Sequence, residues 1–291
     1  MYLVDRGAVK DVVLGVGLVG GALVTALNRK PNRVRTHSAP TSWGNEVAFA
    51  EELESARTWL GAEGAVRVFW CAGRGGFAST DADLAKELQS FRTVLAWSER
   101  LATERRVEFH LTSSAGGLHE GQRRVDSPTP AATMRPYGRL KLQQEQLLEQ
   151  SHGVARFIYR PSSVYGVPRG KVRLGMIPTL IRNALARRPS TISAHPSTLR
   201  DYVSAQDIGA FMASESNQPG VHYLVMGRPM ALTSLIATVE RALQRQVAVV
   251  FTTTKLNDQH ITFSPALRPV DWNPNSLDSQ VALLVTAILK G

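Results

Sequence analysis

Residues 11–27 read "DVVLGVGLVGGALVTAL", and this stretch decides the expected fold. A short apolar run closed by glycine predicts a buried strand over 11–16, and an apolar helix follows it. Between them, Gly15, Gly17 and Gly20 form the pattern G-x-G-x-x-G. The first glycine of such a turn permits a tight bend, the second lets the backbone approach a pyrophosphate, and the third lets the helix pack closely on the strand. The stretch therefore predicts a strand, turn and helix that bind a dinucleotide.

The same stretch also resembles a signal peptide, since residues 12–27 carry no charge and follow Lys10. It is shorter than the roughly 18–20 residues that a membrane span requires, and no A-x-A-like cleavage site follows closely. The only cysteine is Cys71, so we expect no disulfide framework and no cysteine metal cluster, which suits a reducing compartment. We therefore expect a cytoplasmic protein without a membrane partner.

The composition is that of a globular protein, with 291 residues, 43% hydrophobic and 20% charged. Lysine and arginine number 34 against 24 acidic residues, which gives a formal net charge of +10. These basic residues are spread along the chain, which favours small phosphate-bearing ligands over nucleic acid. Arg74, Arg169 and Lys171 lie in expected loops and are interpreted as solvated. The seven histidines show no metal-ligand spacing, so we expect no metal site.

Strand-like and helix-like stretches alternate through the first half of the chain. We expect strands at 11–16, 33–38, 65–73, 107–114 and 155–160, with helices at 17–29, 46–60, 80–105 and 134–150. This order implies right-handed crossovers and an α/β fold of the Rossmann type, with a doubly wound parallel sheet covered on both faces.

The rhythm loosens after residue 160. We expect short strands near 190–193, 222–227 and 247–252, mixed with helices at 172–187, 205–213, 232–244 and 277–289. The sequence therefore predicts an NAD(P)-binding domain over 1–165 and a smaller mixed substrate-binding lobe over 166–291, interleaved with the first domain and not independent of it.

An acidic residue usually holds the ribose hydroxyls about 20 residues after such a glycine turn, and here it is missing. Ser38 stands near that position, with Arg35 and His37 beside it. A missing carboxylate and nearby cationic groups favour NADP over NAD and leave both open. The expected cofactor contacts are Gly15, Gly17, Leu18, Val19, Gly20, Arg35, His37, Ser38, Ala72, Gly73, Tyr137 and Lys141.

Tyr137 and Lys141 stand four residues apart in "PYGRLK", so on a helix they share one face. A free tyrosine hydroxyl is a poor base at neutral pH, and a lysine ammonium one turn away favours its phenolate. Tyr137 can then exchange a proton with a substrate oxygen as hydride moves to or from a nicotinamide. Ser114 ends a predicted strand and can donate a hydrogen bond to that oxygen as charge develops.

Five segments occur in a characteristic order: "GVGLVG", "LTSSAG", "PYGRLKLQQEQLL", "YRPSSVYG" and "RDYVSAQDIGAFM". With them the chain resembles an extended short-chain dehydrogenase/reductase, and more narrowly the NAD(P)-dependent sugar-nucleotide epimerase/dehydratase family. The resemblance implies that Ser114, Tyr137 and Lys141 are catalytic and that Lys141 also holds a ribose hydroxyl. It implies that Arg200 binds the substrate diphosphate. Ser163 stands where many relatives place a substrate-binding asparagine.

The resemblance also implies an enzyme that transfers hydride at a hydroxyl or keto carbon of a nucleotide sugar. Dehydratases of this group carry an acidic pair after the catalytic hydroxyl, whereas Ala115 and Gly116 follow here, so epimerisation or ketone reduction is favoured. The alternatives are a reductase of a non-sugar ketone or aldehyde and a non-catalytic dinucleotide-binding sensor. An intact Ser-Tyr-Lys set argues against the sensor.

Residues near these motifs have simpler expected roles. Glu145 lies one turn beyond Lys141 and is expected to form an ion pair with it. Asp207 is expected to hold the backbone of the second lobe. The helices that contain Trp97 and Leu147 are the candidates for a homodimer contact.

Overall fold

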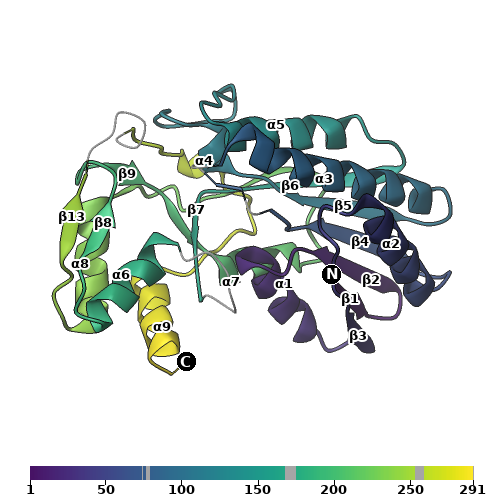
Figure 1. The fold of residues 1–291 in the computed structure, drawn as a ribbon, viewed down its shortest axis with the longest axis horizontal. Helices are drawn as coiled ribbons and strands as arrows, with labels where there is room; N and C mark the ends of the chain where they lie inside the picture. Colours follow the sequence, from purple (N-terminus) through teal and green to yellow (C-terminus); the bar gives the residue numbers. More distant parts are fainter. Residues whose placement is uncertain (74, 77–78, 168–174, 253–258, 291) are drawn as a thin grey trace.

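Seven strands form one central sheet in the order β11-β6-β5-β4-β2-β1-β3 (Figure 1). The computed structural model describes residues 1–73, 75–76, 79–167, 175–252 and 259–290. The strands of the sheet are β1 (Tyr2–Asp5), β2 (Val9–Leu14), β3 (Arg35–Ser38), β4 (Ala65–Trp70), β5 (Val107–Thr112), β6 (Val154–Pro161) and β11 (Gly220–Leu224). Neighbours from β11 to β2 run parallel. The predicted Rossmann-type α/β fold is confirmed.

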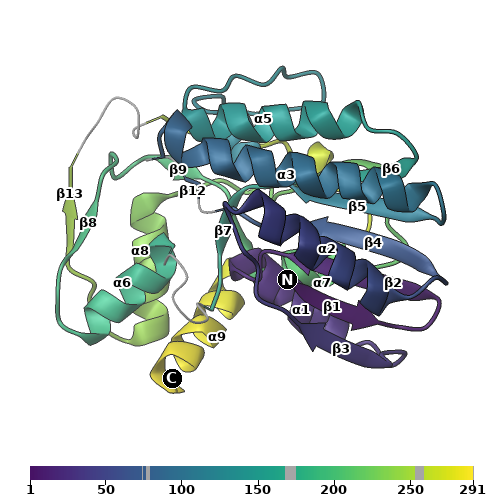
Figure 2. The same cartoon turned by 45° about the vertical axis from the view of Figure 1, so that its right-hand side comes forward.

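Helices cover both faces of this sheet. They are α1 (Leu18–Asn28), α2 (Glu46–Leu60), α3 (Asp81–Ala102), α5 (Pro136–Glu149) and α7 (Ala205–Met212), with the short α4 (Ala115–Leu118) at the sheet edge. Figures 1 and 2 show α2, α3 and α5 on one face and α1 and α7 on the other. Val12 and Leu14 of β2 belong to the core under the first group, whereas Val13 belongs to the core under the second. Strands buried on both faces explain the near-continuous apolar runs of the sequence.

The structure corrects the expected start of the sheet. No strand is expected before residue 11, yet residues 2–5 form β1, which is antiparallel to β2 on one side and to β3 on the other. Leu3 and Val4 are buried in the cores on opposite faces, so even this short strand buries apolar surface on both sides. Because neighbouring strands lie about 4.8 Å apart, the insertion of β1 places β3 about 10 Å from β2.

A smaller lobe follows in the second half of the chain, at the left of Figure 1. Its helices α6 (Met176–Leu185), α8 (Leu232–Leu243) and α9 (Leu277–Lys290) share one apolar core with the parallel pair β8 (Ser190–Ile192) and β13 (Val249–Phe251). Two further pairs join the lobe to the sheet: β7 (Ser163–Tyr165) with β10 (Tyr202–Ser204), and β9 (Leu199–Arg200) with β12 (Met230–Ala231). A short 3-10 helix spans Pro265–Leu267.

Two elements of the second half belong to the central sheet and its cover. β11 pairs with β6 at the sheet edge, and α7 packs on α1 so closely that a Cβ on Gly209 would lie 2.6 Å from the backbone nitrogen of Leu23. A boundary at residue 165 would therefore separate β11 from the sheet that it completes.

Three charged side chains are buried together where β2 meets β4. Asp11 accepts hydrogen bonds from Nε of Arg6 and from Nε of Arg67, each at 2.6 Å. The side chains of Asp11 and Arg6 are fully buried, and Arg6 also pairs with the partly exposed Glu215. Because a buried charge without a partner is costly, this cluster fixes the β1–β2 hairpin to β4.

The helices proposed for a dimer contact direct their apolar residues inward. Trp97 is 1% exposed, and Leu147 packs against the same core. The outward positions of α5 carry Arg139, Gln143 and Gln146. Trp97 and Leu147 fill the protein's own interior, so a contact through these two helices would use their outward polar side chains, and the homodimer stays a prediction. In the described part of the chain, no helix is both long and apolar enough to cross a membrane.

Candidate active site

The glycine turn lies at the carboxyl edge of the sheet, against the segment that follows β4. Gly15 has φ +88°, a conformation that favours glycine, and a Cβ there would collide with the Cα of Ala72. A Cβ on Gly20 would collide with the carbonyl oxygen of Gly15. Side chains at these positions would push the turn away from β4 or α1 away from the turn, so both glycines are required for this packing.

Gly17 differs from its two partners because its surroundings are open. Apart from its own chain neighbours, no atom of the described residues lies within 4 Å of the position that its Cβ would take. Gly17 is the N-cap of α1, and none of the described side chains caps the N–H groups of Leu18 and Val19. Free N–H groups and the helix dipole favour a phosphate anion at this position. The turn therefore fits the pyrophosphate of a dinucleotide.

The residues expected at the end of the second strand lie on β3, with β1 between them and the glycine turn. Ser38 ends β3 at the carboxyl edge, and the ring of His37 stacks on Trp59 at 6.2 Å. Arg35 begins the strand at the opposite edge, where its Nε lies 3.1 Å from Oδ2 of Asp5 and its guanidinium lies 4.4 Å from the Trp59 ring centroid. The insertion of β1 thus moves the strand outward, and Arg35 is engaged away from the carboxyl edge.

Ser114 follows β5 and caps the short helix α4. Its Oγ accepts a hydrogen bond from the N–H of Gly117 at 3.1 Å. Gly117 lies in turn against Tyr137, since a Cβ on Gly117 would be 3.1 Å from Cε1 of that ring. Beside them, Ser113 is buried, and its hydroxyl has no partner among the described residues. The structure therefore brings Ser114 and Tyr137 to the same place.

Tyr137 and Lys141 lie one turn apart on α5, and Nζ of Lys141 is 5.7 Å from the centroid of the Tyr137 ring. The Lys141 side chain is only 5% exposed. Its ammonium donates to Oε1 of Glu87 at 3.1 Å and to Oε1 of Gln144 at 3.0 Å. Burial lowers the pKa of Lys141, but Glu87 and Tyr137 raise it by more, so the pKa stands above its ordinary value.

The expected ion pair between Lys141 and Glu145 is wrong. Glu145 instead accepts from Nε of Arg160 at 3.0 Å and from Nη2 of Arg160 at 2.5 Å. Residues four apart on an α-helix are offset by about 40° around its axis, so they can face different neighbours. Glu145 faces β6, which carries Arg160, whereas Lys141 pairs with Glu87 of α3.

The expected substrate residues lie on paired strands between the sheet and the smaller lobe. Nη1 of Arg200 donates to the carbonyl oxygens of Leu199 and Gln259. The N–H of Ser163 donates to the carbonyl oxygen of Asp201 at 3.0 Å, so the β7–β10 pair places Ser163 beside the residue that follows Arg200. The structure therefore brings these two predicted residues together.

Two aspartates hold the backbone around this region. The buried carboxylate of Asp201 accepts from Oγ of Ser162 at 2.6 Å and from the N–H of Met226 at 2.8 Å. Asp207 accepts from Nδ2 of Asn275 at 2.6 Å and from its N–H at 3.2 Å, in keeping with the expected backbone role. Asp201 thus ties the end of β6 to the segment after β11, which fixes the position of Arg200.

One sequence family accounts for this arrangement. The model of the NAD dependent epimerase/dehydratase family matches residues 12–223, a range that includes the glycine turn, Ser114, the Tyr137–Lys141 pair and Arg200. The chain belongs to the NAD-dependent epimerase/dehydratase family. Membership confirms the predicted family resemblance and the prediction of an enzyme. No curated protein sequence matches the chain.

Solved structures similar to this epimerase/dehydratase-family chain share its fold over nearly the whole length. The UDP-glucose 4-epimerase of Thermus thermophilus, solved with NAD, has a TM-score of 0.78 at 18% identity, covering 97% of this chain and 98% of that one. The UDP-N-acetylglucosamine 4-epimerase of Methanobrevibacter ruminantium has a TM-score of 0.76 at 17% identity, with the same coverage. RMD from Pseudomonas aeruginosa, solved with NADPH, has a TM-score of 0.74 at 16% identity, covering 97% and 98%.

Glu87, the ionic partner of Lys141, is not among the site residues that the sequence predicts. The two residues are 54 positions apart on different helices, so no motif links them. One signal is nevertheless present, because Glu87 falls on the apolar stripe of α3, three residues after the buried Leu84 and four before the buried Phe91. A carboxylate on such a stripe requires a polar partner.

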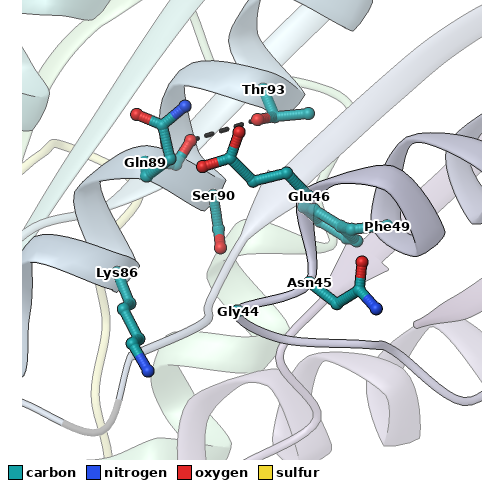
Figure 3. Close-up of a pocket in the computed structure, with 8 residues that line it drawn as sticks. All are labelled: Gly44, Asn45, Glu46, Phe49, Lys86, Gln89, Ser90 and Thr93. Atoms are coloured by element: carbon teal, nitrogen blue, oxygen red, sulfur yellow. Dashed lines mark hydrogen bonds between the residues drawn. The ribbon is translucent and has the colours of Figure 1, made fainter.

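Two hollows lie apart from the glycine turn. One of about 40 Å³ between the start of α2 and α3 is lined by residues that include Asn45 and Lys86 (Figure 3), and it holds a few water molecules at most. The other, of about 480 Å³, has His37 and Trp59 in its wall and no residue of the glycine turn. Among the described side chains, no group of three is placed to hold a metal ion. Arg74, Arg169 and Lys171 lie outside the described residues.

Proposed function

We propose that this enzyme is an NAD(P)-dependent nucleotide-sugar epimerase or oxidoreductase that acts at a hydroxyl or keto carbon. One segment carries the proposal, because it joins the glycine turn to the Tyr-Lys pair. Ala72 contacts Gly15 of the turn, and a Cβ on Gly75 would lie 3.2 Å from Cδ2 of Tyr137. A dinucleotide held at the turn would therefore extend toward Tyr137.

The residues that would hold the dinucleotide follow from the turn. Gly15, Gly17 and Gly20 shape the pyrophosphate site, Leu18 and Val19 supply N–H groups, and Ala72, Gly73 and Lys141 line the path to the reacting end. When bound, the nicotinamide supplies a reversible acceptor for hydride. Ser38 stays a candidate for the adenosine end, and His37 is a weaker one because it faces the pocket under α2. We do not propose Arg35 as a cofactor contact, because its guanidinium pairs with Asp5 at the opposite edge of the sheet. The preference for NADP over NAD therefore rests on the missing ribose-binding carboxylate.

Tyr137 is the proposed acid and base. Its phenolate takes the proton of a substrate hydroxyl as hydride leaves for the nicotinamide, and the tyrosine hydroxyl so formed returns a proton to the carbonyl oxygen during reduction. The ammonium of Lys141, 5.7 Å from the ring centroid, favours the phenolate. The hydroxyl of Ser114 is available as a donor to the same substrate oxygen while its lone pair accepts from Gly117.

Arg200 and Ser163 form the proposed substrate side. The backbone carbonyls bound to Nη1 of Arg200 hold its guanidinium in place, and a planar guanidinium suits the oxygens of a nucleotide diphosphate. The fold shared with two UDP-sugar 4-epimerases supports epimerisation as the leading form of the reaction. A single, largely buried thiol fits a cytoplasmic enzyme.

The test compares Tyr137→Phe with the wild type on UDP-, GDP- and dTDP-sugars in the presence of NAD or NADP. We expect kcat to fall by at least about 100-fold, because the proton-transfer group is lost, while the Kd for the dinucleotide changes by less than about threefold. Tyr2→Phe is the matched control, since this tyrosine bonds Asn28 outside the site. Unchanged turnover in Tyr137→Phe would overturn the mechanism.

A further inference from the structure

A buried carboxylate stands beside the proposed catalytic lysine. Glu87 lies in the second turn of α3, whose start is fixed by a capping box between Thr80 and Asp83. Its Oε1 accepts from Nζ of Lys141 at 3.1 Å and from Nε2 of Gln144 at 3.3 Å. The Glu87 side chain is 9% exposed and that of Lys141 is 5% exposed, so water screens this ion pair weakly.

The same carboxylate faces the segment that joins the site together. A Cβ on Gly73 would lie 2.8 Å from Oε1 and 2.9 Å from Oε2 of Glu87, and one on Gly75 would lie 3.6 Å from Oε2. Gly73 has φ +148°, a backbone conformation that favours glycine, and this conformation brings the Gly73 backbone against the Glu87 carboxylate. Glu87 therefore lies between Lys141 and the segment next to the glycine turn.

Apart from Tyr137, whose phenolate also favours the charged lysine, the other groups around Lys141 do not supply a negative charge to it. Gln144 is neutral, and Glu145 on the same helix is bound to Arg160 of β6. Cys71 directly follows β4, and burial of its thiol raises the pKa of that group to about 11 and keeps it protonated at neutral pH. In the described part of the chain, Glu87 is thus the carboxylate in contact with the ammonium of Lys141.

A lysine as buried as Lys141 would lose its proton readily without such a partner, because burial penalises the charged form. A neutral amine would give no electrostatic support to a phenolate at Tyr137. A carboxylate at 3.1 Å offsets the burial and, together with Gln144, fixes where Nζ points.

We propose that Glu87 is a positioning residue that keeps the Lys141 ammonium charged and holds it beside Tyr137. The inference rests on the proposed function, since it concerns the same Tyr-Lys site, and it adds a residue from a different helix to that site.

The direct test follows the ionisation of Lys141 in the full chain by NMR of its 15N-labelled side chain, with Lys141→Arg used for assignment. In the wild type, we expect a titration midpoint above that of a free lysine, despite burial. In Glu87→Gln, which keeps the shape and removes the charge, we expect the midpoint to fall by at least about one pH unit. Glu87→Asp keeps the charge and should restore most of the shift. Glu99→Gln makes the same chemical change on the same helix and should leave the midpoint unchanged.

A role limited to packing α3 against α5 predicts a lower Tm in Glu87→Gln without a change in the Lys141 midpoint, and that result would overturn the inference. A wild-type midpoint below that of free lysine would overturn it as well, and this measurement needs no variant to fold. With a substrate in hand, the alkaline limb of the kcat–pH profile should move with the Lys141 midpoint while KM stays nearly constant.

If the midpoint shifts as expected but no dinucleotide binds to the wild type, the proposed function fails and the Glu87–Lys141 coupling stands. If the dinucleotide binds and Tyr137→Phe is inactive but the midpoint is unmoved, only the role of Glu87 fails.

Discussion

Gly17→Ala separates binding at the glycine turn from folding. Apart from the chain neighbours of Gly17, no described atom lies within 4 Å of the new methyl group, and the φ of Gly17, −86°, lies outside the positive region that favours glycine. An alanine at an N-cap is somewhat poorer than glycine, so we expect the free energy of unfolding to fall by about 0.5–1 kcal/mol. The same methyl would occupy the space that we propose for the pyrophosphate, and we expect dinucleotide affinity to fall at least 10-fold, or about 1.4 kcal/mol.

The assay combines urea denaturation with titration of NADH and NADPH, followed by nicotinamide fluorescence. Gly21→Ala is the matched control, because it also adds a methyl group into open space but within α1. It should stabilise the protein by about 0.5–1 kcal/mol through the better helix propensity of alanine, and it should leave affinity unchanged. If Gly17→Ala bound both dinucleotides as tightly as the wild type does, the pyrophosphate would not approach this turn, and the cofactor site would have to lie elsewhere.

Two further predictions concern stability. Asp11→Ala leaves two buried arginines without their shared partner, so we expect the free energy of unfolding, measured by urea denaturation, to fall by about 3–5 kcal/mol. Asp81→Ala is the control, because it breaks an exposed ion pair and should lower the free energy of unfolding by less than about 1 kcal/mol. Burial of His110 between two phenylalanine rings lowers its pKa to about 4, below the unfolded value of about 6.5. As pH falls, the unfolded chain therefore binds this proton first, and stability is lost between about pH 6.5 and 4, with about 2 kcal/mol gone by pH 5. His110→Gln should remove this part of the pH dependence, and stability–pH curves that run parallel in the two proteins would contradict the assignment.

Elements with local start and stop signals could be predicted from the sequence. The expected helix over 46–60 has the same bounds in the structure, where Asn45 caps its first turn and Gly61 ends it with φ +70°. The position of β1 could not be predicted in this way. The strand at residues 2–5 is short, and its place depends on pairing with β3, 30 to 36 residues away, so no local periodicity reveals it.

The same division holds in the site. The helical period places Tyr137 and Lys141 on one face of α5, and the glycine spacing describes the turn, because each of these features lies within one short segment. Partner choice depends instead on which elements meet in space. Lys141 has an acidic residue one turn away in the sequence, yet it pairs with Glu87, since α3 packs beside it and Arg160 already occupies Glu145.

These two observations bear on how the family's chemistry is built into this chain. Three parts of the chain resemble the family: the glycine turn, Ser114 and the start of α5. Each of them forms within one short segment, so its local structure does not depend on substitutions in other segments. The parts that connect them are contacts between segments: Gly15 on Ala72, Gly75 on Tyr137, and Gly73 on Glu87. All three contacts involve the few residues after β4, so a change in that segment would disturb the turn, the proposed acid-base tyrosine and the Glu87–Lys141 pair together. Loss of activity after substitution there, with the Ser-Tyr-Lys set intact, is therefore the behaviour that this architecture predicts.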